Sequence, residues 1–252
     1  MSGHSKWATT KHRKAAQDKK RGALFSKLSR IITVAAKTGG DPNPENNAAL
    51  AAAIAKAKSY SLPKDKIEIA INKAFSAGAD AAAYEEVVYE GYGPAGVALY
   101  IEALTDNRNR TAADVRAAFT RAGGNLGASG SVAFQFERRG EITVERSGDL
   151  DEDDLLLLVA EAGGEDLETG DEAVLVYTAP ADVMAVKNAL EAAGVPVKGA
   201  ELVMEPVTTM VVSVGDAGKV LRLVDRLEEL DDIQNVYHTM ELTDEIAEAL
   251  ES

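Results

Sequence analysis

The order of secondary structure expected between residues 141 and 205 constrains the fold more than any other feature. Glu141–Glu145 alternates polar and apolar side chains as a strand does, and a helix follows the acidic run DLDEDD as far as Ala162. Two strands, a helix and a last strand come next, near 166–169, 173–177, 181–193 and 198–204. Strand, helix, strand, strand, helix, strand is the split βαβ order, which predicts a ferredoxin-like domain.

The segments on either side of this unit lack partners of their own. Strands are expected over 87–92, 97–104, 132–136, 209–214 and 233–240, with a helix beginning at Thr111 and another over 217–230. Thr111 would cap its helix in a capping box with Asp114. Because the elements before and after the ferredoxin-like unit need each other to bury their apolar faces, we predict an α/β domain made of 80–130 and 207–252. Residues 131–206 would be inserted into it.

A different periodicity precedes residue 80. Apolar residues recur at helical spacing from Leu24 to Ala35, and Gly39-Gly40 ends that pattern. Asn43 as N-cap and Pro44 as first residue would begin a second helix, and a third follows Leu62-Pro63. The sequence therefore predicts a helical bundle over 22–79, in a multidomain α+β protein.

Charge is distributed very unevenly along the chain. Residues 1–37 contain ten Lys and Arg and one acidic residue, Asp18, although the whole chain carries a net charge of −14. Residues 1–21 also lack apolar periodicity, so we interpret them as an extended basic arm. A basic arm on an acidic body is typical of a protein whose arm meets a polyanion.

The arm combines cationic side chains with rings that can stack on bases. Lys and Arg can neutralise phosphates, and an indole can stack on an exposed base. The alternative is a solvated tail with Trp7 packed against the bundle; we favour nucleic-acid binding, because a lone Trp in an arm poor in apolar residues is unusual. The candidate residues are Lys6, Trp7, Lys11, His12, Arg13, Lys14, Lys19, Lys20 and Arg21.

A second candidate lies in TDNRNRT (105–111), between a strand and a capped helix. Arg108 and Arg110 would place guanidinium groups beside a helix N-terminus, an arrangement that suits phosphate. Alternatively, these arginines pair with carboxylates of the acidic body. Both interpretations remain open from the sequence.

No catalytic, metal or cofactor site emerges from the residue pattern. Gly91, Gly93 and Gly96 match G-x-G-x-x-G, but VALYIEAL follows them, which favours a turn between two strands over a dinucleotide site. The chain has no cysteine, and its three histidines lack metal-ligand spacing. Without a signal peptide or an apolar run of membrane length, we expect a cytoplasmic protein that is not an enzyme and needs no cofactor.

Several stretches together resemble the YebC family, which includes PmpR and the mitochondrial translational activator of cytochrome oxidase subunit I. They span almost the whole chain: GHSKWATTKHRK (3–14), LPKDKIEIAINKA (62–74), YEGYGPAGVA (89–98), TDNRNRTAADVR (105–116), GGNLGASGSVAF (123–134) and DDIQNVYH (231–238). The resemblance implies the three domains predicted above.

The resemblance also implies a role in gene expression, as a DNA-binding transcriptional regulator or as a ribosome-associated factor that binds ribosomal or transfer RNA and relieves stalling. The residues alone leave a third hypothesis, an acidic scaffold that binds a basic protein. No membrane partner is expected.

Overall fold

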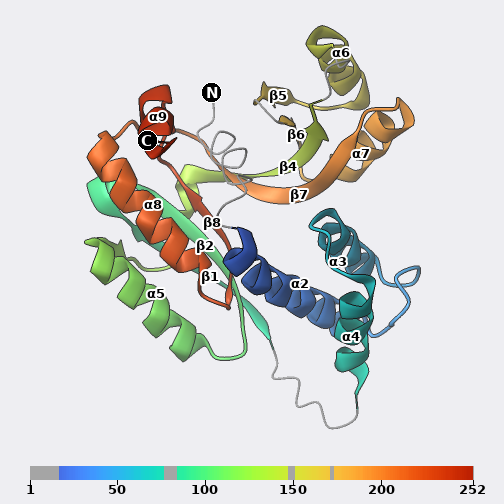
Figure 1. Cartoon of the computed structure of the whole chain (residues 1–252), viewed down its shortest axis with the longest axis horizontal. Helices are drawn as coiled ribbons and strands as arrows, with labels where there is room; N and C mark the ends of the chain where they lie inside the picture. The colour runs from blue at the N-terminus through green and yellow to red at the C-terminus, as the bar shows by residue number, and fades with distance from the viewer. Residues whose placement is uncertain (1–16, 77–83, 147–150, 171–172, 252) are drawn as a thin grey trace.

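The computed structural model describes residues 17–76, 84–146, 151–170 and 173–251, and its mixed α and β architecture is shown in Figure 1. Three helices come first, then two antiparallel sheets with helices packed on them, which confirms the predicted α+β class. Within these residues, no helix is both long and apolar enough to cross a membrane.

The N-terminal helices pack as a small bundle around a core that includes Leu28, Ile32 and Leu50, all at most 2% exposed. Residues 17–21, which we assigned to the arm, already belong to the first helix. The second helix begins at Ala48 instead of Pro44, with Asn47 as its N-cap. The helices are α2 (Gln17–Gly39), α3 (Ala48–Ser59) and α4 (Lys64–Phe75).

The first sheet has the strand order β3-β1-β2-β8, and each neighbouring pair is antiparallel. Its elements are β1 (Glu85–Tyr92), β2 (Ala98–Thr105), α5 (Arg108–Ala122), β3 (Asn125–Leu126), α8 (Val214–Glu228) and β8 (Ile233–His238). Helices α5 and α8 lie side by side on one face (Figure 1), where Leu99 and Ile101 of β2 pack against Phe119 and Leu223. A last helix that we did not predict, α9 (Asp244–Glu251), joins this core through Ile246.

The second sheet confirms the ferredoxin-like prediction. Its antiparallel strand order, β5-β6-β4-β7, places the first strand of the unit between the third and the fourth. Helices α6 and α7 contribute Leu155 and Leu190 to the core on one face. The elements are β4 (Phe136–Glu145), α6 (Glu152–Ala162), β5 (Asp166–Thr169), β6 (Ala173–Thr178), α7 (Val183–Ala192) and β7 (Val197–Pro206).

Two of the predicted strands are wrong. Residues 132–136 form a short 3-10 helix, Ala133–Gln135, and β4 then runs unbroken from Phe136. The N–H groups of Val132 and Ala133 donate to a carboxylate, so they cannot join a strand ladder. Residues 209–214 form only one bridge, between Met210 and Met240.

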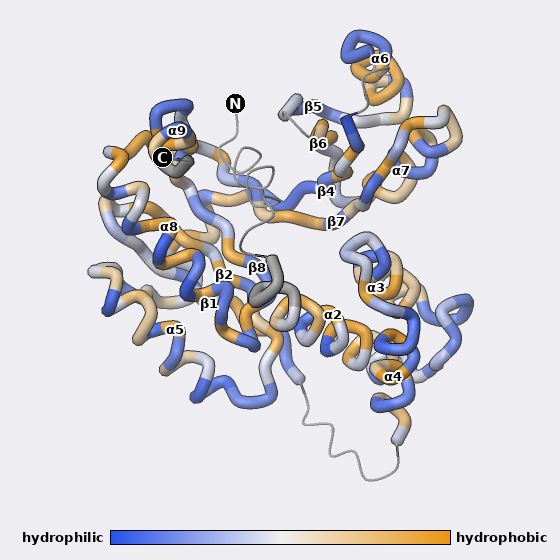
Figure 2. The backbone as a smooth tube through the Cα atoms, in the orientation of Figure 1, coloured by the Kyte–Doolittle hydropathy of each residue, from blue (hydrophilic) through white to orange (hydrophobic). Residues whose placement is uncertain are grey.

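A pair of carboxylates lies where helix α3 of the bundle meets the second sheet. Glu141 of β4 and Glu201 of β7 are directly opposite each other, and Lys56 of α3 forms an ion pair with Glu201. Like charges in directly opposite positions destabilise a sheet. Burial, together with the charges of Glu201 and Glu205, raises the pKa of Glu141 to about 8. Figure 2 shows hydrophilic residues along part of β4, whereas β7 has an apolar stretch at Leu202–Met204.

The raised pKa of Glu141 predicts a pH-dependent stability. The folded protein holds a proton on Glu141 up to a pH of about 8, whereas the unfolded chain releases it at a pH of about 4.3. The free energy of unfolding therefore declines as the pH rises between these two values. Glu141→Gln, which is neutral throughout, should remove this decline and make the protein about 2 kcal/mol more stable at high pH, less than the full shift gives because the group is partly solvated. Urea unfolding at several pH values measures the difference. Glu137→Gln, an exposed position on the same strand, should retain the wild-type pH dependence.

Candidate nucleic-acid interface

The residues predicted to bind nucleic acid divide into three groups in the structure. Arg108 and Arg110 belong to α5 and are fully described. The second group lies in the first turns of α2, where the structure describes the backbone: Lys19, Lys20 and Arg21. The third group lies outside the described residues: Lys6, Trp7, Lys11, His12, Arg13 and Lys14.

Two basic residues further along α2 fasten the helix to the first sheet and its helices. Lys27 Nζ donates to the Glu228 carbonyl at 2.6 Å, at the C-terminal end of α8, where a cation complements the helix dipole. Arg30 Nη1 donates to the Asp231 carbonyl at 2.8 Å and to Asp232 Oδ1 at 3.0 Å. These contacts hold the middle of α2, around Lys27 and Arg30, beside the end of α8 and the start of β8 (Figure 1).

Asp232 is the centre of this junction and is only 7% exposed. Its Oδ2 accepts hydrogen bonds from Thr111 at 2.7 Å, from Arg110 at 2.8 Å and from Thr105 at 3.1 Å. Burial disfavours the charged carboxylate, but the hydrogen bonds from Arg110 and Thr111 outweigh it and hold the pKa of Asp232 below its usual value. One carboxylate thus connects α2, the end of β2, the start of α5 and the segment before β8.

The two arginines predicted from TDNRNRT have carboxylate partners. Arg110 Nη2 lies 2.7 Å from Asp106 Oδ1 and 2.8 Å from Asp232 Oδ2, and half of its side chain is exposed. Arg108 Nη1 lies 3.7 Å from Glu85 Oε2, with 63% of its side chain exposed. A phosphate would compete with two carboxylates for Arg110 but with one distant carboxylate for Arg108.

Helix α5 begins earlier than predicted, so these arginines are inside its first turn. The cap is Asn107, whose Oδ1 accepts from the Arg110 N–H at 3.1 Å. The Thr111 hydroxyl is not a cap, because it is engaged with Asp232 and with the Asn107 carbonyl. The cap predicted at Thr111 does not form, because the Thr111 hydroxyl makes a tertiary hydrogen bond to Asp232 instead.

The glycine motif of residues 91–96 forms a turn between β1 and β2, as predicted. Gly93 N–H donates to the Val97 carbonyl at 2.8 Å, and Gly96 has a φ of 79°. A side chain at Gly91 would lie 2.6 Å from the Asn125 carbonyl and 2.8 Å from the Phe119 ring. Close packing against β3 and α5 accounts for this glycine.

The glycine-rich loop 123–131 is fixed by a buried carboxylate that sequence reasoning did not identify. Glu90, which is 4% exposed, accepts hydrogen bonds from the backbone N–H groups of Gly130 at 2.6 Å and of Val132 and Ala133 at 2.8 Å. Its position on β1 carried no signal in the sequence, because its three partners are about 40 residues away.

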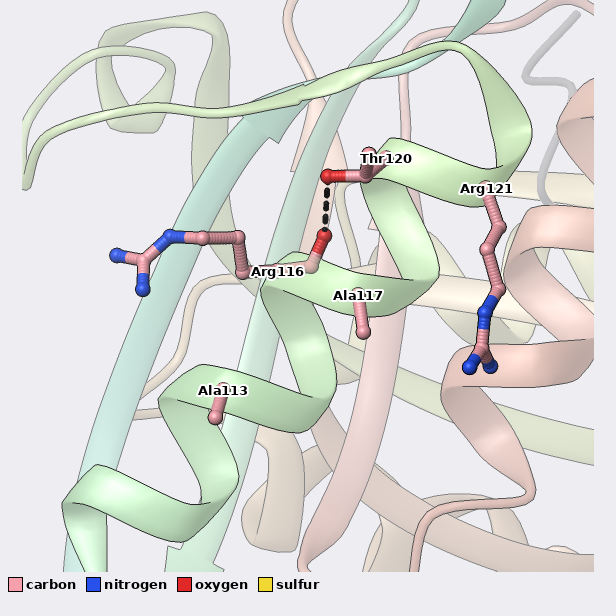
Figure 3. Close-up of a pocket in the computed structure, with 5 residues that line it drawn as sticks. All are labelled: Ala113, Arg116, Ala117, Thr120 and Arg121. Carbon is pink, nitrogen blue, oxygen red and sulfur yellow. Dashed lines mark hydrogen bonds between the residues drawn. The ribbon is translucent and has the colours of Figure 1, made fainter.

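Sequence reasoning also missed two arginines on the outer face of α5, Arg116 and Arg121. Figure 3 shows them extending to opposite sides of a shallow hollow floored by Ala113 and Ala117. Within the part of the chain that the structure describes, neither guanidinium forms an ion pair or a hydrogen bond. The available signal was two arginines against one acid, Asp114, in the helix expected from Thr111 onward in an acidic protein.

Comparison with known proteins places this architecture in one family. Residues 5–77 match the model described as the TACO1/YebC protein N-terminal domain, and residues 84–240 match that of the TACO1/YebC second and third domain. A crystal structure of a conserved hypothetical protein from Aquifex aeolicus is 46% identical, with a TM-score of 0.83 over 94% of this chain and 96% of that one.

Curated relatives cover almost the full length. A probable transcriptional regulatory protein of Bifidobacterium animalis subsp. lactis is 51% identical over 251 residues, covering 100% of this chain and 99% of the relative. One of the same description from Enterococcus faecalis is 52% identical over 242 residues, covering 96% and 99%. The chain therefore belongs to the TACO1/YebC family.

Proposed function

We propose that this protein is a non-enzymatic, nucleic-acid-binding regulator of gene expression, acting on DNA as a transcriptional regulator. The observation that carries the proposal is the concentration of positive charge in residues 1–37 of a chain whose net charge is −14. The names of the relatives, probable transcriptional regulatory proteins, support the same role. The acidic remainder would limit indiscriminate adhesion to polyanions, so that contact is directed through the arm and the start of α2.

Neutralising the arm should remove most of the salt dependence of binding. Each phosphate contact contributes about 0.9 to the slope of log affinity against log salt on DNA, so seven contacts contribute about 6. The variant carries Gln at Lys6, Lys11, Arg13, Lys14, Lys19, Lys20 and Arg21. Fluorescence anisotropy of a labelled duplex at several salt concentrations measures the slope.

A control variant neutralises three basic residues of the ferredoxin-like domain that already have carboxylate partners: Arg146, Lys187 and Lys198. It should leave the slope close to the wild-type value. A wild-type slope in the arm variant would refute the proposal.

The alternative that the family resemblance raises is a ribosome-associated factor that binds ribosomal or transfer RNA. Crosslinking in cells followed by sequencing of the bound nucleic acid separates the two roles, because promoter DNA supports transcription and structured RNA supports translation. The scaffold hypothesis predicts instead that protein partners are retained after nuclease treatment.

A further inference from the structure

The outer face of α5 carries two arginines, Arg116 and Arg121, that no internal contact among the described residues explains. The helix carries four arginines and Asp114, a net charge of +3, in a chain of net charge −14. Arg110 is held by two carboxylates, whereas Arg116 and Arg121 have none within the described residues. Leaving two cations unpaired in an acidic protein favours an anionic partner.

The hollow between these arginines is shallow and open, and the side chains that line it suit contact with a phosphate backbone. Its volume is about 370 Å³, and its lining contains no acidic or aromatic side chain: Ala113, Arg116, Ala117, Thr120 and Arg121. The Thr120 hydroxyl donates to the Arg116 carbonyl at 2.9 Å, so the floor is made of small, locally satisfied side chains. A phosphate strand can approach such a helix closely, while the absence of a ring in the lining argues against base stacking.

The helix is held rigidly behind this surface. Val115 and Phe119 are fully buried and Ala118 is 2% exposed, all packed on the first sheet. The five-residue separation of Arg116 and Arg121 places their Cα atoms about 7.5 Å apart along the helix axis. The two side chains extend to opposite sides of the hollow (Figure 3), so each guanidinium can engage a phosphate of its own while the helix stays in place.

We propose that the outer face of α5 is a phosphate-binding surface, separate from the arm, on which Arg116 and Arg121 contact the backbone of double-stranded nucleic acid. This inference rests on the proposed function and assigns it a site. It also assigns the phosphate contact on α5 to Arg116 and Arg121 instead of Arg110, because Arg110 is paired with Asp106 and Asp232.

The test compares full-length Arg116→Gln/Arg121→Gln with wild type on duplexes of about 20 base pairs, one of DNA and one of RNA, by salt-dependent anisotropy. Two lost phosphate contacts should lower the salt slope by about 2 on at least one duplex, and the duplex affected identifies the source of the phosphate. The control Arg146→Gln/Lys187→Gln removes the same charge from residues paired with Glu152 and Glu191, and should leave the slope unchanged.

A second pair of variants tests the same surface while keeping both arginines, so that an effect on folding can be told from an effect on binding. Ala113→Glu places a carboxylate three residues before Arg116, a spacing that permits a helix-stabilising ion pair while occupying the guanidinium. It should reduce the slope, and Ala113→Gln should not.

The outcomes separate this inference from the function on which it rests. If the arm variant loses its slope while Arg116→Gln/Arg121→Gln keeps the wild-type slope on both duplexes, the α5 surface is overturned and the regulator proposal stands. If wild-type protein binds neither duplex at low salt, both are overturned.

Discussion

Replacing Asp232 with Ala should destabilise the protein by about 3 kcal/mol, the low end of the cost of breaking a buried ion pair. The low end applies because half of the Arg110 side chain is exposed and can be rehydrated, and because Arg30 keeps its hydrogen bond to the Asp231 carbonyl. The hydroxyls of Thr105 and Thr111 also lose their shared acceptor. Urea unfolding followed by circular dichroism at neutral pH measures the change.

The neighbouring residue provides a matched control. Asp231→Ala removes the same charge from an exposed side chain and keeps the backbone carbonyl that Arg30 uses, so it should change stability by less than about 0.5 kcal/mol. Because the pKa of Asp232 is lowered in the folded state, its contribution is present above about pH 3.9 and is lost as the pH falls through the folded pKa. Equal stabilities of the two variants at neutral pH would contradict the role of Asp232.

Replacing Glu90 with Ala should cost about 3 kcal/mol and release the glycine-rich loop. The substitution leaves the N–H groups of Gly130, Val132 and Ala133 without their acceptor, and each buried unsatisfied donor costs about 1 to 3 kcal/mol. The total stays near 3 kcal/mol because the Gly130 and Ala133 groups are only partly buried and water can reach them. Hydrogen exchange of the loop amides, together with urea unfolding, measures both effects.

Two other substitutions on β1 distinguish loop ordering from a general loss of stability. Glu90→Gln keeps one carboxamide oxygen as an acceptor and should give intermediate protection of the loop amides. Glu86→Ala changes an exposed residue of the same strand and should leave exchange unchanged. Wild-type protection of the loop in Glu90→Ala would show that the glycine-rich loop is ordered by other contacts.

The architecture could be predicted from the sequence because it depends on signals that are local in the chain. The alternation of Glu141–Glu145, the helical spacing in α2 and the turn at Gly93–Gly96 each arise within a few residues. The order of these elements then predicted the ferredoxin-like sheet, since few topologies connect them without crossings.

Boundaries were predicted less well wherever a tertiary contact competed with a local one. Asn43-Pro44 is a good local start for a helix, yet α3 is capped by Asn47. The Asn47 side chain also donates to the Ala35 carbonyl at the end of α2, a partner that sequence spacing does not reveal. The strand expected at 132–136 does not form for the same reason, because the N–H groups of Val132 and Ala133 donate to the Glu90 carboxylate.

The sequence by itself determined the fold class, the split βαβ order and the contrast between a basic start and an acidic body, because each is a property of composition and periodicity. Only the tertiary structure decided which arginines of α5 are available to a partner. Asp232 reaches Arg110 across 122 residues of chain, whereas no described carboxylate reaches Arg116 or Arg121. Charge pairing depends on distances in space, and the order of residues does not encode those distances until the sheet brings β8 beside β2.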